Sequence, residues 1–455
     1  MGITLINLLM KRIWKIVLII VAVILIAVGY FGYEIYLHVA GSESLGESSA
    51  IPEYSDKHPP INTFEHDWPN WRGPALNGKS SLVSIKADWS DSLTKLWTVD
   101  FLCQDNRTAT WSSVVVQGNR LIVPGRDEDH DLLFCLNSKT GELIWENKYA
   151  AETNSSHGPG PRATPVINED YVYTFGRSGD VACWKLFDGE LVWHKKTTDI
   201  GGKEPNWGYS ATPFVYKNLL IIQGGGTNTI QAYNKYSGDV VWTALEGPAG
   251  FSAANLIKLE GQNYLVIYHG TGLSLIHPDD GNVLWTVPYE TSYGVNATTP
   301  LVLGDKILHA SGYDMGAQLV KAGVDNYEIL WANNEYQPQH SDPIEVNGYL
   351  YGYSGESGRP KGDFLCIEIA SGEIKWSTKE LGQGTTIFAG GYLITLDLKG
   401  NLSLLKPNPN KYEKVGEVKA AIPNVRHLAW TVPVVANGKL YLRYLQHLIC
   451  YDISI

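Results

Sequence analysis

The chain has 455 residues and a formal net charge of −11 at neutral pH, with 36 basic and 47 acidic side chains. A negative balance of this size argues against nucleic acids or anionic membrane surfaces as the main partners. The length would suit about three average domains, so the number of domains has to be decided from patterns within the sequence.

The N-terminal region predicts membrane attachment. Lys11, Arg12 and Lys15 precede an uncharged apolar run from 16 to 33, and Glu34 follows it. A run of this length reaches the roughly 17–25 residues that a spanning helix needs, and the positive flank stays on the cytoplasmic side. We therefore expect a cytoplasmic segment over 1–12 and a transmembrane signal anchor over 13–36. The expected location is the inner membrane, single-pass, with the rest of the chain on the periplasmic side.

A cleaved signal peptide is the alternative for this region, with a weak cleavage candidate at Val39-Ala40-Gly41. Residues 37–66 are rich in Ser, Glu, Pro and Gly and contain few large apolar side chains. This composition predicts a flexible linker between the anchor and the remainder of the chain.

Beyond the linker, a tryptophan recurs at intervals of 43 to 49 residues. Each one ends a short run typical of a β-strand, and most of these runs follow a turn that contains glycine. The recurring residues are Trp97, Trp145, Trp193, Trp242, Trp285, Trp331 and Trp376. A period of 40 to 50 residues is typical of a repeat architecture, in which each unit is one supersecondary element.

Each repeat contains four short strands. A Thr-Pro pair opens the first strand at 164–165, 212–213 and 299–300, and proline suits the first position of a strand because no ladder donor is needed there. Sets of first to third strands are expected at 111–137, 164–188, 211–236, 252–279, 298–324, 341–369, 385–406 and 431–453. Four antiparallel strands per repeat predict an all-β, eight-bladed propeller.

The last set lacks a fourth strand, whereas the strand that ends at Trp97 precedes the first set. We therefore expect the N-terminal strand to complete the last blade, which closes the ring and removes two open sheet edges. Residues 67–455 then form one domain. Val415 is expected to replace the tryptophan in the blade that lacks one.

The five cysteines do not predict disulfides. Cys135, Cys183 and Cys366 each lie ten residues before the tryptophan of their blade, and Cys450 holds the matching position in the last blade. Equivalent positions in different blades are too far apart to be bridged, since Cα atoms must approach within about 7 Å. These cysteines are expected to act as small buried hydrophobes.

The loops that lead from one blade into the next carry aromatic and polar residues that a turn does not require. They are expected to surround one mouth of the central channel, and Tyr, Trp and Arg are enriched at binding hot spots. The predicted binding residues are Arg162, Trp207, Tyr209, Phe251, Tyr293, Asn296, His340, Trp430 and Arg443. The alternative is structural: the aromatics plug the channel or pack on adjacent loops, and the two arginines form salt bridges between blades.

No sequence pattern predicts a catalytic residue or a metal site. The histidines lie in loops of different blades without metal-ligand spacing, and no GxSxG, P-loop or dinucleotide motif is present.

The tryptophan repeats and Thr-Pro openings resemble the pyrroloquinoline-quinone-like (PQQ-like) propeller repeat family over about residues 67–455. The stretch Asp67-Trp68-Pro69-Asn70-Trp71-Arg72-Gly73-Pro74 and the stretch Gly158-Pro159-Gly160-Pro161-Arg162-Ala163-Thr164-Pro165 resemble the exported, BamB-like subgroup. The resemblance implies that the recurring tryptophans dock each blade to its neighbour.

Two functions follow from this resemblance. The first, which we favour, is a protein-binding scaffold in the cell envelope that has no redox cofactor. The second is an alcohol or sugar dehydrogenase that depends on PQQ and calcium. Such enzymes have an adjacent cysteine pair that this chain lacks, and Asn296, Asp314 and Glu335 are only weak candidates for calcium ligands. Glycan binding by the aromatic loops is a third possibility.

Overall fold

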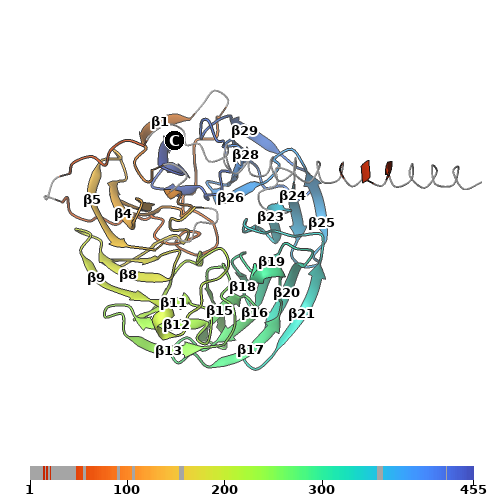
Figure 1. Cartoon of the computed structure of the whole chain (residues 1–455). Coiled ribbons are helices and arrows are strands. Elements are labelled where there is room, and N and C mark those ends of the chain that lie inside the picture. The colour runs from red at the N-terminus through yellow and green to blue at the C-terminus, as the bar shows by residue number, and fades with distance from the viewer. Residues whose placement is uncertain are drawn as a thin grey trace, which may run out of the picture.

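The computed structural model describes residues 14, 15, 17, 18, 21, 48–54, 58–89, 93–104, 108–152, 158–355, 362–426 and 428–455. In this part of the chain, thirty-two strands form eight four-stranded antiparallel sheets arranged as a ring (Figure 1). The structure thus confirms the eight-bladed, all-β propeller.

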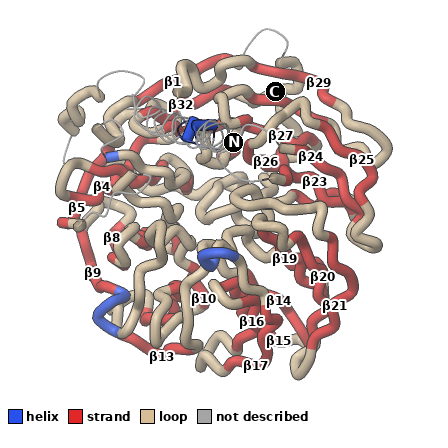
Figure 2. Tube along the Cα trace, turned by 45° about the vertical axis from the view of Figure 1, so that its right-hand side comes forward, coloured by secondary structure: helices blue, strands red, loops and turns tan. Residues whose placement is uncertain are grey.

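Blade 1 consists of β2 (Val115–Gln117), β3 (Arg120–Arg126), β4 (His130–Asn137) and β5 (Leu143–Ala150), and blade 2 consists of β6 (Val166–Asn168), β7 (Tyr171–Phe175), β8 (Asp180–Lys185) and β9 (Leu191–Lys196). Blade 3 consists of β10 (Phe214–Tyr216), β11 (Leu219–Gln223), β12 (Ile230–Asn234) and β13 (Val240–Ala244). Blade 4 consists of β14 (Asn255–Leu259), β15 (Gln262–His269), β16 (Gly272–Ile276) and β17 (Val283–Pro288). Blade 5 consists of β18 (Leu301–Leu303), β19 (Lys306–Ser311), β20 (Gly316–Ala322) and β21 (Tyr327–Asn333). Blade 6 consists of β22 (Ile344–Val346), β23 (Tyr349–Ser354), β24 (Asp363–Glu368) and β25 (Ile374–Thr378). Blade 7 consists of β26 (Gly384–Ala389), β27 (Tyr392–Asp397), β28 (Leu402–Leu405) and β29 (Lys414–Val418). Blade 8 combines β30 (Val434–Ala436), β31 (Lys439–Tyr444) and β32 (His447–Asp452) with β1 (Thr94–Val99). Two short 3-10 helices, η2 (Thr197–Ile200) and η3 (Ser292–Gly294), lie in loops between blades (Figure 2).

The N-terminal strand closes the ring. β1 pairs antiparallel with β32, and Trp97 lies opposite Cys450 in this pairing. The same register places Trp145 opposite Cys135 and Trp193 opposite Cys183. All five cysteines are buried and none forms a disulfide, and Cys135, Cys183, Cys366 and Cys450 fill the positions opposite tryptophans.

The tryptophans dock each blade to the next one. In six blades the indole Nε1 donates a hydrogen bond of 2.8–3.1 Å to a backbone carbonyl oxygen of the following blade. The ring of Trp145, for example, lies against Gly189 in the turn before β9, where a Cβ atom would come within 2.5 Å of the indole. Gly189 also has a φ of 75°, so both the turn and the docked ring require glycine.

Blade 7 departs from this pattern in a way that the sequence did not predict. Gly416, and not Val415, lies opposite Leu404 in this blade. In the other seven blades a tryptophan holds the corresponding position of the outer strand. Trp89, a fully buried residue from the segment before β1, covers the vacant position, with its Cβ 3.0 Å from where a Cβ of Gly416 would lie. An indole from outside the repeat therefore fills this place in the ring.

Residues 66–86, which we call the strap, cross the channel. Each blade begins with its inner strand, so the loops that open the blades lie at one end of the channel, the upper mouth. The strap contacts the inner strands and the turns that follow them, on the side of the lower mouth, and its Trp71 and Arg72 reach up to residues that directly precede β18 and β22. Trp68 and Val116 of blade 1, for example, exchange two backbone hydrogen bonds of 2.8 and 2.9 Å.

The strap contacts every blade. Its hydrogen bonds include Ile167 N–H to the Pro69 carbonyl (blade 2), the Trp71 indole N–H to the Thr299 hydroxyl (blade 5), Ser80 N–H to the Phe388 carbonyl (blade 7) and Asn437 N–H to the His66 carbonyl (blade 8). Leu76 packs against the apolar cluster formed by blades 3 and 4. The strap therefore occupies the lower mouth and connects blades that are distant in sequence.

A buried ion pair joins the strap to blade 6. Arg72 lies 2.8 Å from the carboxylate of Asp342, with 4% and 7% of the two side chains exposed, and also donates to the Pro343 carbonyl. Burial lowers the pKa of Arg72 to about 9, so the guanidinium stays charged at neutral pH. Lys79 adds a half-buried pair with Glu345, at 2.6 Å.

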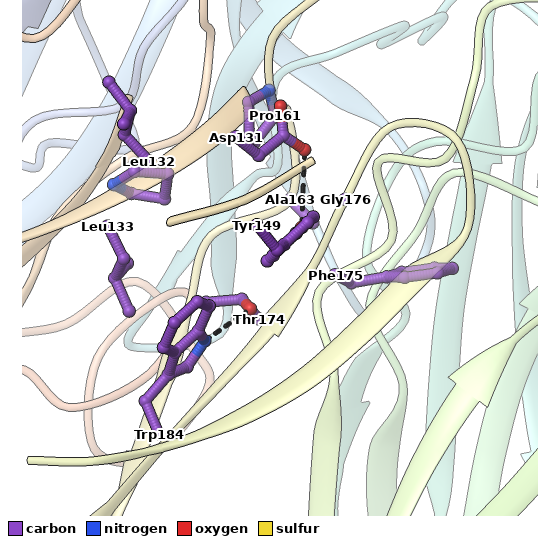
Figure 3. Close-up of a pocket in the computed structure, with 11 residues that line it drawn as sticks. Asp131, Leu132, Leu133, Tyr149, Pro161, Ala163, Thr174, Phe175, Gly176 and Trp184 are labelled. Atoms are coloured by element: carbon purple, nitrogen blue, oxygen red, sulfur yellow. Dashed lines mark hydrogen bonds between the residues drawn. The ribbon is translucent and has the colours of Figure 1, made fainter. Parts of the chain in front are cut away.

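A second buried network joins blades 1 and 2 beside a small cavity (Figure 3). Arg126 and Asp131 form an ion pair of 2.6 Å, and the Tyr149 hydroxyl donates to the other oxygen of Asp131 at 3.3 Å. His194 stacks on Tyr149 and pairs with Asp180 at 2.9 Å. Burial raises the pKa of Asp131 to about 6, against the opposing effect of Arg126.

The predicted membrane anchor is not supported and has to be corrected. Most of 13–36 lies outside the described residues, and in the described part of the chain no helix is long and apolar enough to cross a membrane. The single-pass anchor and the inner-membrane location inferred from it are therefore withdrawn. The prediction rested on the length of an apolar run, and that length alone does not establish a spanning helix.

Part of the predicted linker lies on the propeller. Residues 37–47 are outside the described residues, but the carbonyl oxygens of Pro59 and Pro60 accept hydrogen bonds from Arg120 and Asn119 of blade 1. Arg120 is completely buried. The segment from 58 onward is thus attached to blade 1 before the strap begins.

We predict that Gly189→Ala destabilises the propeller by about 2–4 kcal/mol, because the left-handed backbone costs about 1 kcal/mol and overpacking against Trp145 adds about 1–3 kcal/mol. Gly304→Ala is the matched control, since Gly304 has a similar φ of 67° and no atom within 4 Å of the added methyl group. Urea unfolding of both variants measures the difference. Equal losses would show that the indole contact does not resist the methyl group.

We predict that Asp342→Ala destabilises the protein by about 3–5 kcal/mol, because it leaves the Arg72 charge buried without its carboxylate. The double variant Arg72→Met/Asp342→Ala should recover a large part of this loss, and Arg72→Met completes the thermodynamic cycle. Unfolding free energies of the four proteins test the coupling. Additive single losses would contradict a direct interaction.

The raised pKa of Asp131 predicts a specific pH dependence. Between about pH 4 and pH 6 the folded protein keeps this proton while the unfolded chain releases it, so this group's contribution to stability falls as the pH rises through that window. Relative to wild type, Asp131→Asn should gain up to about 3 kcal/mol between pH 4 and pH 7. Unfolding free energies at the two pH values measure the gain, and a pH-independent difference would contradict the raised pKa.

Candidate binding site at the channel mouth

The upper mouth is formed by loops that are far apart in sequence and converge toward the centre of the ring (Figure 1). The structure divides the predicted binding residues into two classes. Trp207, Phe251 and Trp430 are half-buried, as is Arg162, whereas Tyr293 and His340 are exposed. Tyr209, Asn296 and Arg443 are buried in the interior.

One group of rings comes from the loops that open blades 1, 6 and 8. The rings of Trp111 and Trp430 are 5.0 Å apart between centroids, and His340 packs edge-on against Trp430 at 6.2 Å. We call these three residues the Trp430 group. The contact between His340 and Trp430 joins two blades that are not neighbours in the ring.

A second group comes from the loops that open blades 3, 4 and 5 and from the turn between β19 and β20 of blade 5. The Trp207 ring lies 6.2 Å from Phe251 and 5.6 Å from Tyr293, and Tyr293 packs edge-on against Tyr313 at 6.5 Å. We call these four residues the Trp207 group. Tyr293 is 68% exposed and has a φ of 62°, a conformation that costs a non-glycine residue about 1–2 kcal/mol. Strain that presents an aromatic ring to solvent is typical of a functional surface.

Arg162 is linked to both groups. One terminal nitrogen donates to the carbonyl oxygen of Trp207 at 2.5 Å, and the other donates to that of Gly158 at 3.3 Å. Burial, and then the nearby charge of Arg177, lower the pKa of Arg162 to about 10, so it is charged at neutral pH. Arg162 in turn acts on His340 of the Trp430 group.

His340 is neutral under the same conditions. Part of its ring is open to solvent, but the surrounding protein, and then the charge of Arg162, lower its pKa to about 4. The two side chains belong to blades 2 and 6, on opposite sides of the ring, and the charge of Arg162 is the second cause of the lowered pKa of His340.

Arg177 has its own carboxylate. It lies 3.1 Å from Glu204, and its side chain is only 1% exposed. Its carbonyl oxygen accepts a hydrogen bond from Tyr209 N–H, which fixes the loop that carries Trp207. Arg177 and Tyr313 were not among the predicted binding residues, because they lie in turns between second and third strands. Those turns occur at the same end of a blade as the opening loops, so the order of the strands could have identified them.

Three predicted residues form architectural bonds in the interior. The Tyr209 hydroxyl donates to the Gly224 carbonyl at 2.7 Å. The Asn296 amide donates to the carbonyl oxygens of His269 and Tyr289, at 2.7 and 2.9 Å, and its oxygen accepts from Thr291. These bonds hold the loop that opens blade 5.

Arg443 joins blade 8 to blade 1. It donates to the carbonyl oxygens of Ser112 and Pro124, at 2.8 and 2.7 Å, and to the Thr110 hydroxyl. Burial lowers its pKa to about 10. Arg443 therefore links two blades, as in the structural alternative, but its acceptors are neutral oxygens and not the carboxylate of a salt bridge.

The residues considered for calcium do not form a coordination site. The Asn296 side chain is fully used in the bonds above, and Asp314 and Glu335 are exposed in turns. Within the described ranges, no group of three or more His, Cys, Asp or Glu side chains could hold a metal ion. We therefore derive no chemical step through calcium or a quinone.

Comparison with known proteins places this geometry in a family. Residues 151–378 match the family described as outer membrane protein assembly factor BamB. Similar curated proteins include BamB of Moranella endobia, 25% identical over 185 residues (40% of this chain, 43% of that protein), and tetrathionate hydrolase of Acidithiobacillus ferrooxidans, 22% identical over 199 residues (40% and 38%). The matched regions thus cover about two fifths of these relatives.

Solved structures share the fold at low identity. BamB from Moraxella catarrhalis superposes with a TM-score of 0.56 at 15% identity, over 79% of this chain and 98% of that one. Quinohemoprotein alcohol dehydrogenase from Comamonas testosteroni superposes with a TM-score of 0.59 at 14% identity, over 85% and 80%. The structural likeness extends to both scaffold and enzyme, but the family match covers half of the chain, and this protein therefore belongs to the BamB family of PQQ-like repeat propellers.

Proposed function

We propose that this propeller is a scaffold that binds a partner protein of the cell envelope through the upper mouth of its channel. The observation that carries the proposal is that the Trp430 and Trp207 groups gather rings from six blades at the upper mouth, where Arg162 is hydrogen-bonded to the backbone of Trp207. Partly exposed Trp, Tyr and Arg side chains are typical of binding hot spots.

The asymmetry between the two mouths supports this assignment. The strap occupies the lower mouth with buried side chains such as Trp68 and Arg72, whereas the upper mouth presents exposed ones such as Tyr293 and His340. A partner that enters the channel would therefore approach from the upper side. The name of the family, an assembly factor for outer membrane proteins, is consistent with a protein partner.

The dehydrogenase alternative has less support. Structural neighbours include quinohemoprotein alcohol and methanol dehydrogenases, but their identity of 12–14% shows the fold alone. The candidate calcium ligands of this chain do not come together, and no adjacent cysteine pair is present in the sequence. Binding of a partner without a redox cofactor remains our proposal, and no described feature of the mouth favours a glycan over a protein.

We predict that Trp207→Ala/Trp430→Ala weakens partner binding by at least about 30-fold, since the truncation of a single hot spot already costs about 2 kcal/mol or more. A photo-crosslinking residue at position 293 in cells should capture a discrete partner in the otherwise wild-type protein and lose it in the double variant. Position 83, a 91% exposed strap residue, provides the crosslinking control.

The matched control variant is Phe187→Ala/Tyr236→Ala, which removes two exposed rings from turns at the other end of the blades. It should retain the partner. Melting temperatures of both variants confirm that the fold persists. If Trp207→Ala/Trp430→Ala keeps every crosslinked partner, the upper mouth is not the contact surface.

A further inference from the structure

We propose that Tyr293 is a protruding contact residue of the upper mouth, and that a folded domain of the partner receives its ring in an apolar pocket whose rim carries lysine or arginine. The inference rests on the proposed function and specifies the shape and the charge of the partner's surface. It excludes a linear segment of the partner as the part that contacts Tyr293.

The backbone at Tyr293 is the first argument. Tyr293 and Gly294 are consecutive left-handed residues, with φ of 62° and 67°, and Val295 N–H donates to the Ser292 carbonyl at 3.4 Å across them. In tight turns of this kind the first left-handed position usually holds asparagine, aspartate or glycine. A tyrosine at that position destabilises the free protein, and strain of this sort is concentrated at functional sites.

A second turn of blade 5 has the same arrangement. Tyr313 and Asp314, between β19 and β20, have φ of 58° and 60°, and Met315 N–H donates to the Gly312 carbonyl at 3.3 Å. In the described part of the chain, Tyr293 and Tyr313 are the only aromatic residues with a positive φ, and their ring centroids lie 6.5 Å apart, edge to face. Two turns in contact thus each place a tyrosine where the backbone favours a smaller residue.

The ring of Tyr293 remains largely in water although its loop is firmly held. Tyr293 is 68% exposed, and its contacts with Trp207 and Tyr313 are both edge to face. Behind the turn, the Asn296 amide donates to the Tyr289 carbonyl at 2.9 Å. A ring fixed in this way loses little conformational freedom on binding. Because most of the ring is accessible, a pocket buries more of it than a flat surface does.

The charges beside the two turns indicate the rim of that pocket. Residues 289–296 and 312–315 contain two acidic side chains, Glu290 and Asp314, and no lysine or arginine. Both carboxylates are exposed, and neither forms an ion pair with another described residue. Lysine or arginine at the rim of the partner's pocket complements these charges.

Photo-crosslinking in cells tests the shape of the partner's surface. The crosslinking residue p-azidophenylalanine at position 293 keeps a ring of about the size of tyrosine, and mass spectrometry locates its adducts on the captured protein. A pocket should give adducts on two or more segments that are far apart in the partner's sequence. Adducts confined to one short stretch of that sequence would show a linear segment and overturn the proposal.

A crosslinking residue at the exposed position 340 measures the contribution of Tyr293. Tyr293→Ala should lower the yield of the partner adduct at least about tenfold, since loss of one hot-spot ring weakens binding by about 30-fold or more. Tyr293→Phe should keep the yield within about fivefold, the effect of one neutral hydrogen bond. Tyr293→Gly should lose the adduct as Tyr293→Ala does but melt at a higher temperature, because glycine relieves the strained φ. A loss that follows the melting temperature would show a structural role and overturn the proposal.

Matched acidic variants test the charge of the rim. Asp314→Asn should lower the adduct yield about threefold, the effect of one exposed charge pair. Asparagine tolerates the left-handed backbone at this position. Asp325→Asn is the control, because Asp325 is exposed in the turn between β20 and β21, at the other end of the same blade, and should leave the yield unchanged. Equal yields in the two variants would overturn the basic rim.

The outcomes distinguish this inference from the proposed function. An unchanged yield in Tyr293→Ala, together with a loss in Trp207→Ala/Trp430→Ala, would overturn the role of Tyr293 and leave the upper mouth as a binding surface. If neither variant lowers the yield, the contact surface lies elsewhere and the proposed function fails as well. Absence of any adduct from positions 293 and 340 in the otherwise wild-type protein would overturn both.

Discussion

The structure depends on one repeated interaction, the docking of an indole ring against a glycine in the next blade. Trp97, Trp145, Trp193, Trp242 and Trp331 each lie so close to such a glycine that a Cβ atom there would approach the ring to 2.5–2.8 Å. The apolar area buried by an indole favours association of neighbouring sheets, and the indole N–H finds a carbonyl in the same neighbour in most blades. Because the interaction is the same in kind at five of the eight interfaces between blades, most neighbouring blades pack in the same way around the ring.

This regularity explains why so much of the fold could be predicted from the sequence. The tryptophan interval, the glycine turns and the prolines directly before β6, β10 and β18 are local signals, and each reports one step of the same repeat. The prediction failed where the repeat is interrupted: in blade 7 the register position belongs to Gly416 and Trp89 supplies the ring from outside. The membrane anchor was inferred from the apolar character of one segment, without any packing partner to constrain the inference.

The candidate site was predictable only in part, for a physical reason. The repeat pattern predicted that Trp207, Tyr293, His340 and Trp430 lie in opening loops. They were recognised there because a turn does not require such residues. The pattern could not show that the charge of Arg162 contributes to the lowered pKa of His340, 178 residues away in the sequence. Nor could it separate exposed from buried members of the set: Asn296 and Arg443 have the same polar character as binding residues, yet the structure uses them to hold loops and blades together.

The two ends of the channel are made unequal by the strap, and this inequality links the fold to the function. A closed ring of similar blades would have two open mouths, each lined by loops or turns. The strap occupies one of the two mouths, contacts all eight blades and buries Arg72 against Asp342. Each indole links a blade only to the next one, whereas the strap also links blades that are not neighbours. The inner strands, such as β22, are only three to six residues long, so the strap that contacts them lies close to the opening loops at their other end. The strap therefore also supports these loops. The opening loops therefore continue into inner strands that the strap ties together, and a surface fixed in this way would lose less conformational entropy on binding a partner.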